Sequence, residues 1–221
     1  MIEIENVMKA LADKRKIFHS EADFQHALAW EIHKRWPSSS IRLEFKPAHL
    51  DNRIYLDIWA TCQDSILAVE VKYKTRKFCV NIDGEEFNLR NQRAQNGARY
   101  DFLKDIERLE EVVSGRSNIV GYAIFLTNDY LYWKEPRRRD TLDAKLRIHE
   151  GKKVEGKLDW AKNTRKGTKG GREKAIDIKG SYTLRWKDYS EPKKCYGKFK
   201  YLFVEVSNKQ KGRRGIVFCE S

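Results

Sequence analysis

The stretch that decides the fold is NRIYLDIWATCQDSILAVEVKY, residues 52–73. Two runs of alternating apolar residues flank the polar segment TCQDS, which is the pattern of a β-hairpin. We centre the turn between Gln63 and Asp64. The apolar residues then face one another in three pairs: Ile58 with Val69, Ala60 with Leu67, and Leu56 with Val71. These pairs form one continuous apolar face, as a sheet buried on one side requires.

The same register determines the other face of the hairpin. Asp57 falls opposite Glu70, and Tyr55 falls opposite Lys72. Opposed Cβ atoms lie about 4.5–5.5 Å apart, so two facing carboxylates repel unless they share a proton or a cation. Mg²⁺ binds one or two carboxylates together with waters and substrate phosphates. The hairpin therefore predicts a divalent-metal site. The alternative is a wider turn with a shifted register, which would leave an ordinary ion pair on a solvated sheet face.

Helices and strands alternate around this hairpin. A helix is expected over residues 20–36, starting at a capping box of Ser20 and Asp23. Further elements are a strand at 41–46, a hairpin turning at Asp83-Gly84, a helix over about 91–113, an apolar strand at 118–127, and late strands at 181–186 and 198–206. This order predicts an α/β (α+β) domain. It has a mixed central sheet flanked by helices, and a basic β-rich C-terminal extension.

Charge is distributed unevenly along the 221 residues. Residues 1–130 contain 19 Lys and Arg against 20 Asp and Glu, whereas residues 131–221 contain 26 against 12. The whole excess of +13 therefore comes from the C-terminal part. Such asymmetry indicates a surface that binds a polyanion, and nucleic acid is the common one. The alternative is a basic protein whose lysines are merely solvated.

Several classes of protein are not indicated. No apolar run approaches the ~18 residues of a membrane span, and the N-terminal residues lack the apolar core of a signal peptide. We therefore expect a cytoplasmic protein without a membrane partner. The four cysteines are far apart and form no CxxC pair, so neither a zinc site nor a disulfide framework is expected.

Asp57 followed by Glu70-Val71-Lys72 resembles the signature of the PD-(D/E)XK nuclease superfamily, the restriction-endonuclease-like proteins. Leu56 stands where the pattern names a proline. The predicted order of elements over residues 20–127 is also similar to the core of that superfamily: a helix, three antiparallel strands, a helix and a further strand. The resemblance implies a catalytic core within residues 1–130. Residues 131–221 would then complete the fold and contact nucleic acid.

The resemblance implies roles for four neighbouring residues. Asp57 and Glu70 would bind Mg²⁺ or Mn²⁺, and the Val71 carbonyl would be a further ligand. Lys72 would orient or help deprotonate the attacking water and stabilise charge on the phosphate. This agrees with the chemistry, because phosphodiester hydrolysis needs a cation to offset developing negative charge and to activate a water near neutral pH.

Two further candidates come from the same resemblance. Many members place a glutamate on the first helix, and Glu21 is the candidate here; it would equally stabilise the positive end of that helix. Some relatives carry Q-x(3)-Y on the helix after the third strand. Gln95 and Tyr100 are one residue too far apart for that motif. Gln95 remains a candidate by position, with helix capping or solvation as the alternative.

The expected phosphate contacts all lie in the basic extension. They are Arg137, Arg138, Arg139, Lys166, Lys169, Arg172, Lys174, Arg213 and Arg214. Most belong to exposed segments rich in Gly, Lys and Arg, where a side chain can reach a nucleic-acid backbone.

The sequence thus predicts a Mg²⁺-dependent endonuclease that hydrolyses DNA, with RNA left open as a substrate. The resemblance implies restriction, defence or repair without separating them. A concerted double-strand cut by single sites would need a homodimer. Two alternatives remain: a catalytically inactive nucleic-acid-binding protein on a nuclease-like fold, and a basic structural subunit whose partner is another protein.

Overall fold

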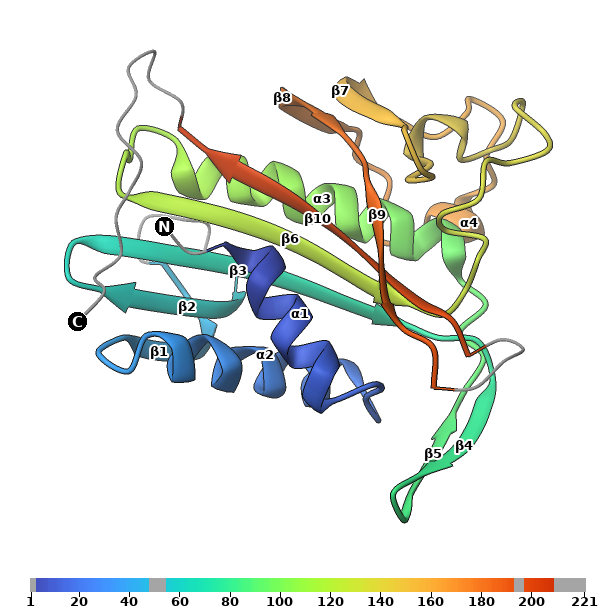
Figure 1. The fold of residues 1–221 in the computed structure, drawn as a ribbon. Coiled ribbons are helices and arrows are strands. Elements are labelled where there is room, and N and C mark those ends of the chain that lie inside the picture. The colour runs from blue at the N-terminus through green and yellow to red at the C-terminus, as the bar shows by residue number, and fades with distance from the viewer. Residues whose placement is uncertain (1–2, 48–54, 193–196, 209–221) are drawn as a thin grey trace.

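A six-stranded mixed sheet forms the middle of the molecule (Figure 1). The structure is a computed structural model that describes residues 3–47, 55–192 and 197–208. The strand order is β1-β2-β3-β6-β10-β9, in which β3 and β6 are parallel and all other neighbours are antiparallel. The strands of this sheet are β1 (Ser40–Phe45), β2 (Leu56–Cys62), β3 (Ser65–Lys74), β6 (Ile119–Thr127), β9 (Trp186–Ser190) and β10 (Phe199–Ser207).

Helices cover both faces of the sheet (Figure 1). The helices are α1 (Ile4–Lys14), α2 (Glu21–Arg35), α3 (Gln95–Val113) and α4 (Lys166–Lys169), with a short 3-10 helix η1 (Ala144–Leu146). Two hairpins complete the described fold: β4 (Phe78–Ile82) with β5 (Glu85–Leu89), and β7 (Lys153–Leu158) with β8 (Ile176–Thr183). The β4–β5 hairpin projects beyond the end of β3, whereas β8 contacts α3. The molecule is therefore mixed α/β with a mixed central sheet flanked by helices.

Alternation along the strands creates a hydrophobic core on each face. On β3, Leu67, Val69 and Val71 pack in the core beneath α1 and α2. Ala68 lies between them in sequence and packs on the α3 side. This two-residue period is what the extended backbone dictates, and it sends Glu70 and Lys72 toward α3.

The predicted register of the β2–β3 hairpin is confirmed from Ile58 to Cys62, where Ile58 pairs with Val69 and Ala60 with Leu67. The predicted pairing of Leu56 with Val71 is wrong. Leu56 packs on the α3 side of the sheet, whereas Val71 packs on the α2 side. The cause lies at Asp57, whose carboxylate accepts the Val71 N–H at 2.6 Å and takes the place of a backbone partner.

The predicted helices are present with altered ends. Ser20 caps α2 by accepting the Asp23 N–H at 3.1 Å. Helix α3 begins at Gln95 rather than near residue 91, because Gln92 is held against the end of β3 by two hydrogen bonds with Thr75. The helix α1 was not predicted, although its buried residues follow helical spacing; they are Ile4, Val7, Met8 and Leu11.

The predicted hairpin turn at Asp83-Gly84 is confirmed. Asp83 and Gly84 both have positive φ values, 51° and 88°, as a tight two-residue turn between β4 and β5 requires. After residue 130, β10 pairs with β6 over residues 200–207, so the C-terminal part of the chain adds two strands to the central sheet. Among the described residues, none of the helices combines the length and apolarity needed to cross a bilayer.

Phe102 tests the contact between α3 and the sheet. Its side chain is 0% exposed and stacks edge-on against Phe125 of β6. Phe102→Ala should lower the free energy of unfolding by about 3–5 kcal/mol, because it removes buried area and leaves a cavity. Leu142→Ala, at a side chain that is 41% exposed, should change it by no more than about 0.5 kcal/mol. Urea unfolding followed by circular dichroism measures both; equal effects would contradict this packing.

Candidate functional site

The carboxyl groups of Asp57 and Glu70 meet where β2 and β3 separate. Asp57 Oδ2 accepts the Val71 N–H at 2.6 Å, and the Asp57 and Glu70 carboxyls are close enough for each to shift the pKa of the other. Glu70 is buried, with 2% of its surface exposed, whereas Asp57 is partly accessible. Carboxyls brought this close repel each other unless they share a proton or a cation.

Burial and neighbouring charge shift the protonation of both residues. Burial raises the pKa of Asp57, against the opposing effects of Lys72 and the Val71 N–H. Burial also raises the pKa of Glu70 well above its usual range, and the Asp105 carboxylate adds to this, while Arg108 opposes it. A cation at this position would relieve the repulsion between the two carboxyls.

Lys72 lies beside the two carboxyls and is itself held in place. Its Nζ is 2.7 Å from Asp105 Oδ2 and donates to the Val71 carbonyl at 3.1 Å. Burial disfavours its charged form, but the carboxylates of Asp105, Glu70 and Asp57 outweigh burial and raise the pKa of Lys72. Lys72 is therefore a protonated ammonium group at neutral pH.

Two residues of α3 complete this cluster and were missed by the sequence analysis. Arg108 NH1 lies 2.6 Å from Glu70 Oε1 and 3.5 Å from Asp105 Oδ1. The sequence analysis found no base for Glu70, and Arg108 supplies one from outside the hairpin. The sequence does contain a sign of Asp105, because a charged residue there lies beside the apolar helical stripe that includes Phe102 and Ile106. The cluster thus has three carboxyls, from Asp57, Glu70 and Asp105, and two cations, from Lys72 and Arg108.

The structure places Glu21 at a neighbouring position rather than on Asp57 or Glu70. Its Oε2 accepts the Tyr73 N–H at 2.7 Å and binds Lys74 Nζ at 2.8 Å. The α2 residue that reaches Asp57 is Gln25, one turn later. Gln25 Nε2 donates to the Asp57 carbonyl at 2.7 Å and to Glu44 Oε1 at 2.8 Å.

Gln95 is engaged away from the carboxyl pair. Its Nε2 donates to Asp129 Oδ2 at 2.9 Å, which ties the start of α3 to the chain just after β6. This contact explains Gln95 as a structural link between two elements. Among the predicted site residues, the structure therefore brings together Asp57, Glu70, Val71 and Lys72, with Glu21 nearby.

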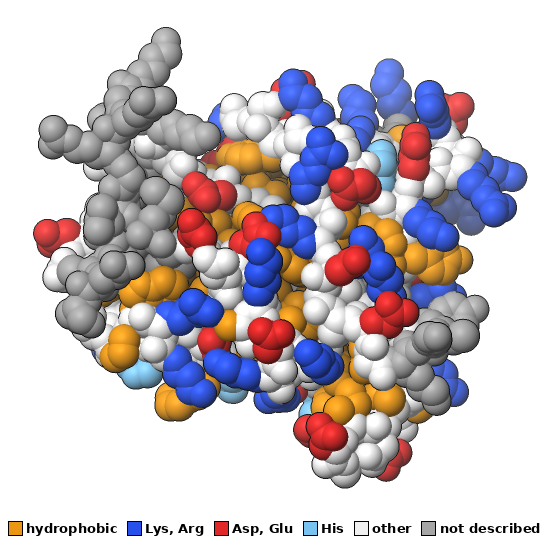
Figure 2. Space-filling view, viewed as in Figure 1, with side chains coloured by type: hydrophobic (Ala, Val, Ile, Leu, Met, Phe, Trp, Pro, Cys, Tyr) orange, Lys and Arg blue, Asp and Glu red, His pale blue; other side chains and the backbone are white. Residues whose placement is uncertain are grey.

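The predicted phosphate contacts lie on the surface of the C-terminal part. Arg137 and Arg138 are exposed, and Arg139 is exposed beside Glu135 at 3.7 Å. Lys166 and Lys174 are exposed and Lys169 is half-buried, while Arg172 is drawn onto α3 by Asp101. Arg213 and Arg214 lie outside the described residues. In Figure 2, Lys and Arg side chains gather at the upper right, where Figure 1 shows β7 and the chain around α4.

The donor set at the carboxyl pair suits a hard divalent cation. Asp57 and Glu70 offer carboxylate oxygens and Val71 offers a carbonyl, the ligand types that Mg²⁺ and Mn²⁺ prefer. Nowhere in the described part of the chain do three His, Cys, Asp or Glu side chains form a ready-made metal cage. A cation here would keep waters or substrate oxygens in its remaining positions, as Mg²⁺ usually does.

No protein-family model matches this chain, and no curated protein or solved structure is significantly similar to it. Its chemistry must therefore be inferred from its own residues.

Asp105 provides a test of the cluster through pH. Burial, countered in part by Lys72, raises the pKa of Asp105 to about 6 from 3.8. Between pH 4 and pH 6 the unfolded chain has released this proton and the folded chain retains it, so stability falls as pH rises through that window. Asp105→Asn removes this proton uptake. Relative to the variant, the wild type should lose on the order of 2 kcal/mol of unfolding free energy across the window.

Urea unfolding at pH 4.5, 5.5 and 6.5 measures this difference. Asp140→Asn, at an exposed aspartate, is the matched control and should follow the wild type. Parallel pH profiles for wild type and Asp105→Asn would show that Asp105 is not a buried member of the cluster.

Proposed function

We propose that this protein is a Mg²⁺- or Mn²⁺-dependent endonuclease that hydrolyses phosphodiester bonds in DNA. One observation carries the proposal: the Asp57 and Glu70 carboxyls meet beside a protonated lysine, Lys72, at the end of a strand pair. A catalytic divalent cation requires acidic groups held close together, and one of this pair, Asp57, is partly accessible.

The arrangement of elements supports the same proposal. Helix α2, the antiparallel strands β1, β2 and β3, helix α3, and β6 parallel to β3 occur in this order, with the β4–β5 hairpin inserted between β3 and α3. This is similar to the core of the PD-(D/E)XK nucleases, in which the acidic residues lie on the second and third strands. Asp57 and Glu70 lie on β2 and β3.

The chain's own residues would divide the work of hydrolysis. A bound Mg²⁺ or Mn²⁺ would offset charge on the phosphate and make a water nucleophilic near neutral pH. Asp57, Glu70 and the Val71 carbonyl would hold it. Because Lys72 is protonated, its role is to stabilise negative charge on the phosphate rather than to accept a proton. Asp105 orients Lys72, with its Oδ2 2.7 Å from Nζ.

A specific contact favours a second candidate, a nucleic-acid-binding protein without catalysis. Arg108 binds Glu70 Oε1 at 2.6 Å and so occupies an oxygen that a metal would need. Together with Lys72, it neutralises most of the acidic cluster. In that case the cluster is a buried ion-pair network, and the basic C-terminal part alone would act, by binding a nucleic-acid backbone.

Cleavage of supercoiled plasmid separates the two candidates. Asp57→Asn and Lys72→Ala should each lower the rate of Mg²⁺- or Mn²⁺-dependent cleavage by about 100-fold or more, because each removes a group that offsets charge in the transition state. Asp64→Asn, at an exposed aspartate in the turn of the same hairpin, should cleave like the wild type. DNA binding without cleavage by the wild type would favour the second candidate.

The salt dependence of DNA binding tests the basic surface. Arg137→Ala combined with Arg138→Ala should reduce the slope of log K against log salt by about 2, because each exposed arginine that neutralises a phosphate releases about one counterion. Fluorescence anisotropy at several NaCl concentrations measures the slope.

The control is Lys34→Ala combined with Arg42→Ala, which removes the same charge from exposed positions on α2 and β1. These elements lie away from α4 and the β7–β8 hairpin (Figure 1). An equal loss of slope in both double variants would show that the arginines act only through net charge.

A further inference from the structure

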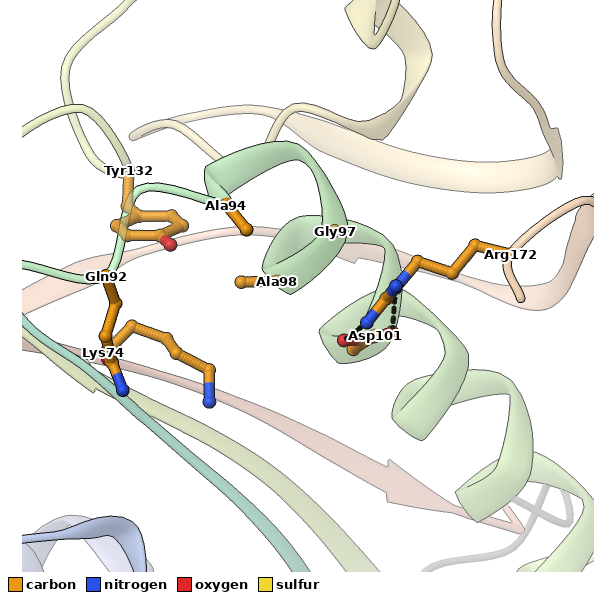
Figure 3. Close-up of a pocket in the computed structure, with 8 residues that line it drawn as sticks. All are labelled: Lys74, Gln92, Ala94, Gly97, Ala98, Asp101, Tyr132 and Arg172. Carbon is orange, nitrogen blue, oxygen red and sulfur yellow. Dashed lines mark hydrogen bonds and ion pairs between the residues drawn. The ribbon is translucent and has the colours of Figure 1, made fainter. Parts of the chain in front are cut away.

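A pocket of about 250 Å³ lies at the start of α3, beside the end of β3. Figure 3 shows Lys74 and Gln92 on one side of it, Arg172 on the other, and the first turns of α3 between them. Lys74 follows Lys72 by two residues on β3, so the pocket begins about 7 Å along the strand from the candidate active site. The pocket is thus a neighbour of that site and contains none of its proposed metal ligands.

The start of α3 has no acidic residue in its own first turn, although the Asp129 carboxylate binds the Gln95 side chain there from outside the helix. Ala94 is the N-cap of α3 and offers no side-chain hydrogen bond, and the first turn contains no acidic residue. No residue in the first turn of this 19-residue helix therefore offsets the partial positive charge at its N-terminal end. Gly97 leaves the helix surface open toward Arg172, since a Cβ at Gly97 would lie 3.3 Å from the guanidinium carbon.

A buried hydroxyl points into the same pocket. Tyr132 is 1% exposed, and its hydroxyl has no hydrogen-bond partner although it lines the pocket (Figure 3). Burial raises the pKa of Tyr132, so this group is a protonated donor at neutral pH. A buried donor without an acceptor destabilises a fold, which makes Tyr132 an independent sign that an acceptor belongs here.

Two cations flank the hydroxyl and keep donors available. Lys74 Nζ binds Glu21 Oε2 at 2.8 Å, which leaves two of its three N–H groups. Arg172 binds Asp101 through Nε and NH2, both at 2.7 Å, and its NH1 has only a long contact of 3.4 Å with the Gly170 carbonyl. The acidic partners hold both cations in position. The remaining N–H donors of Lys74 and Arg172 are suited to bind an oxyanion.

We infer that this pocket binds a phosphate group. In the proposed function, this is the nucleic-acid phosphate adjacent to the one that Lys72 would contact. Helix N-termini with nearby cations bind phosphate well, and Tyr132 supplies the donor that fixes an oxygen. The identity of the strand rests on the proposed function, whereas phosphate binding itself does not. Free phosphate has the same chemistry and therefore serves as the probe.

The first experiment measures thermal unfolding with inorganic phosphate against NaCl of equal ionic strength. Phosphate should raise the midpoint for the wild type. Tyr132→Phe should bind phosphate roughly tenfold more weakly, because one hydrogen bond to a charged group is lost. Without phosphate, Tyr132→Phe should be no less stable than the wild type, since the hydroxyl has no partner to lose.

Tyr182→Phe is the matched control. The Tyr182 hydroxyl donates to Glu110 at 2.9 Å, outside the pocket. This variant should lose stability but keep the phosphate response. Gly97→Ala is a second pocket variant, because its methyl group crowds Arg172, and it should also weaken the response. No response in the wild type, or an unchanged response in Tyr132→Phe, would overturn the inference.

A second experiment identifies the source of the phosphate. In an Asp57→Asn background, which separates binding from cleavage, adding Tyr132→Phe should weaken binding of a short DNA duplex by roughly tenfold. Equal affinity for the duplex in Asp57→Asn and in the double variant would overturn the assignment to a strand phosphate. Asp57→Asn is also tested alone. If it cleaves DNA as fast as the wild type, the proposed catalytic role is wrong. If it keeps the phosphate response as well, the inference that the pocket binds phosphate still holds.

Discussion

The hydrogen bond from the Val71 N–H to the Asp57 carboxylate, at 2.6 Å, organises the candidate site. It replaces backbone pairing at the point where β2 and β3 separate, and it turns Leu56 toward α3. It also brings the Asp57 carboxyl to Glu70, which regular cross-strand pairing of two like charges would disfavour. The apolar part of the hairpin, from Ile58 to Cys62, is paired regularly.

The packing of α3 against β3 sets the charge balance of the cluster. Asp105 holds Lys72 and Arg108 holds Glu70, so the helix contributes one acid and one base to a largely buried set. Breaking one such contact leaves an uncompensated charge, which is why the cluster constrains the helix as firmly as apolar packing does. A divalent cation would compete with Arg108 for the Glu70 oxygens.

The hairpin register could be predicted from the sequence because it depends on local alternation and one short turn. The same register predicted Asp57 opposite Glu70, but regular pairing ends at Ile58, and the position of the Asp57 carboxyl depends instead on its hydrogen bond with the Val71 N–H. The roles of Asp105 and Arg108 could not be predicted, because they depend on how α3 rotates against β3, which no local pattern specifies. The same limit explains why Gln25, one helical turn from Glu21, reaches Asp57 instead. The phosphate pocket depends on Tyr132 and Lys74, which are distant in sequence and meet only through the tertiary fold.

The claim that Asp57 and Glu70 form a metal site is tested most directly by counting bound Mn²⁺. Electron paramagnetic resonance reports free Mn²⁺ in matched samples of wild type and Asp57→Asn, each with the same short DNA duplex at pH 7.5. The account predicts that the wild-type sample binds about one more ion per chain than the variant sample, since a single carboxylate-lined site is involved. Equal amounts of bound Mn²⁺ in the two samples would contradict it.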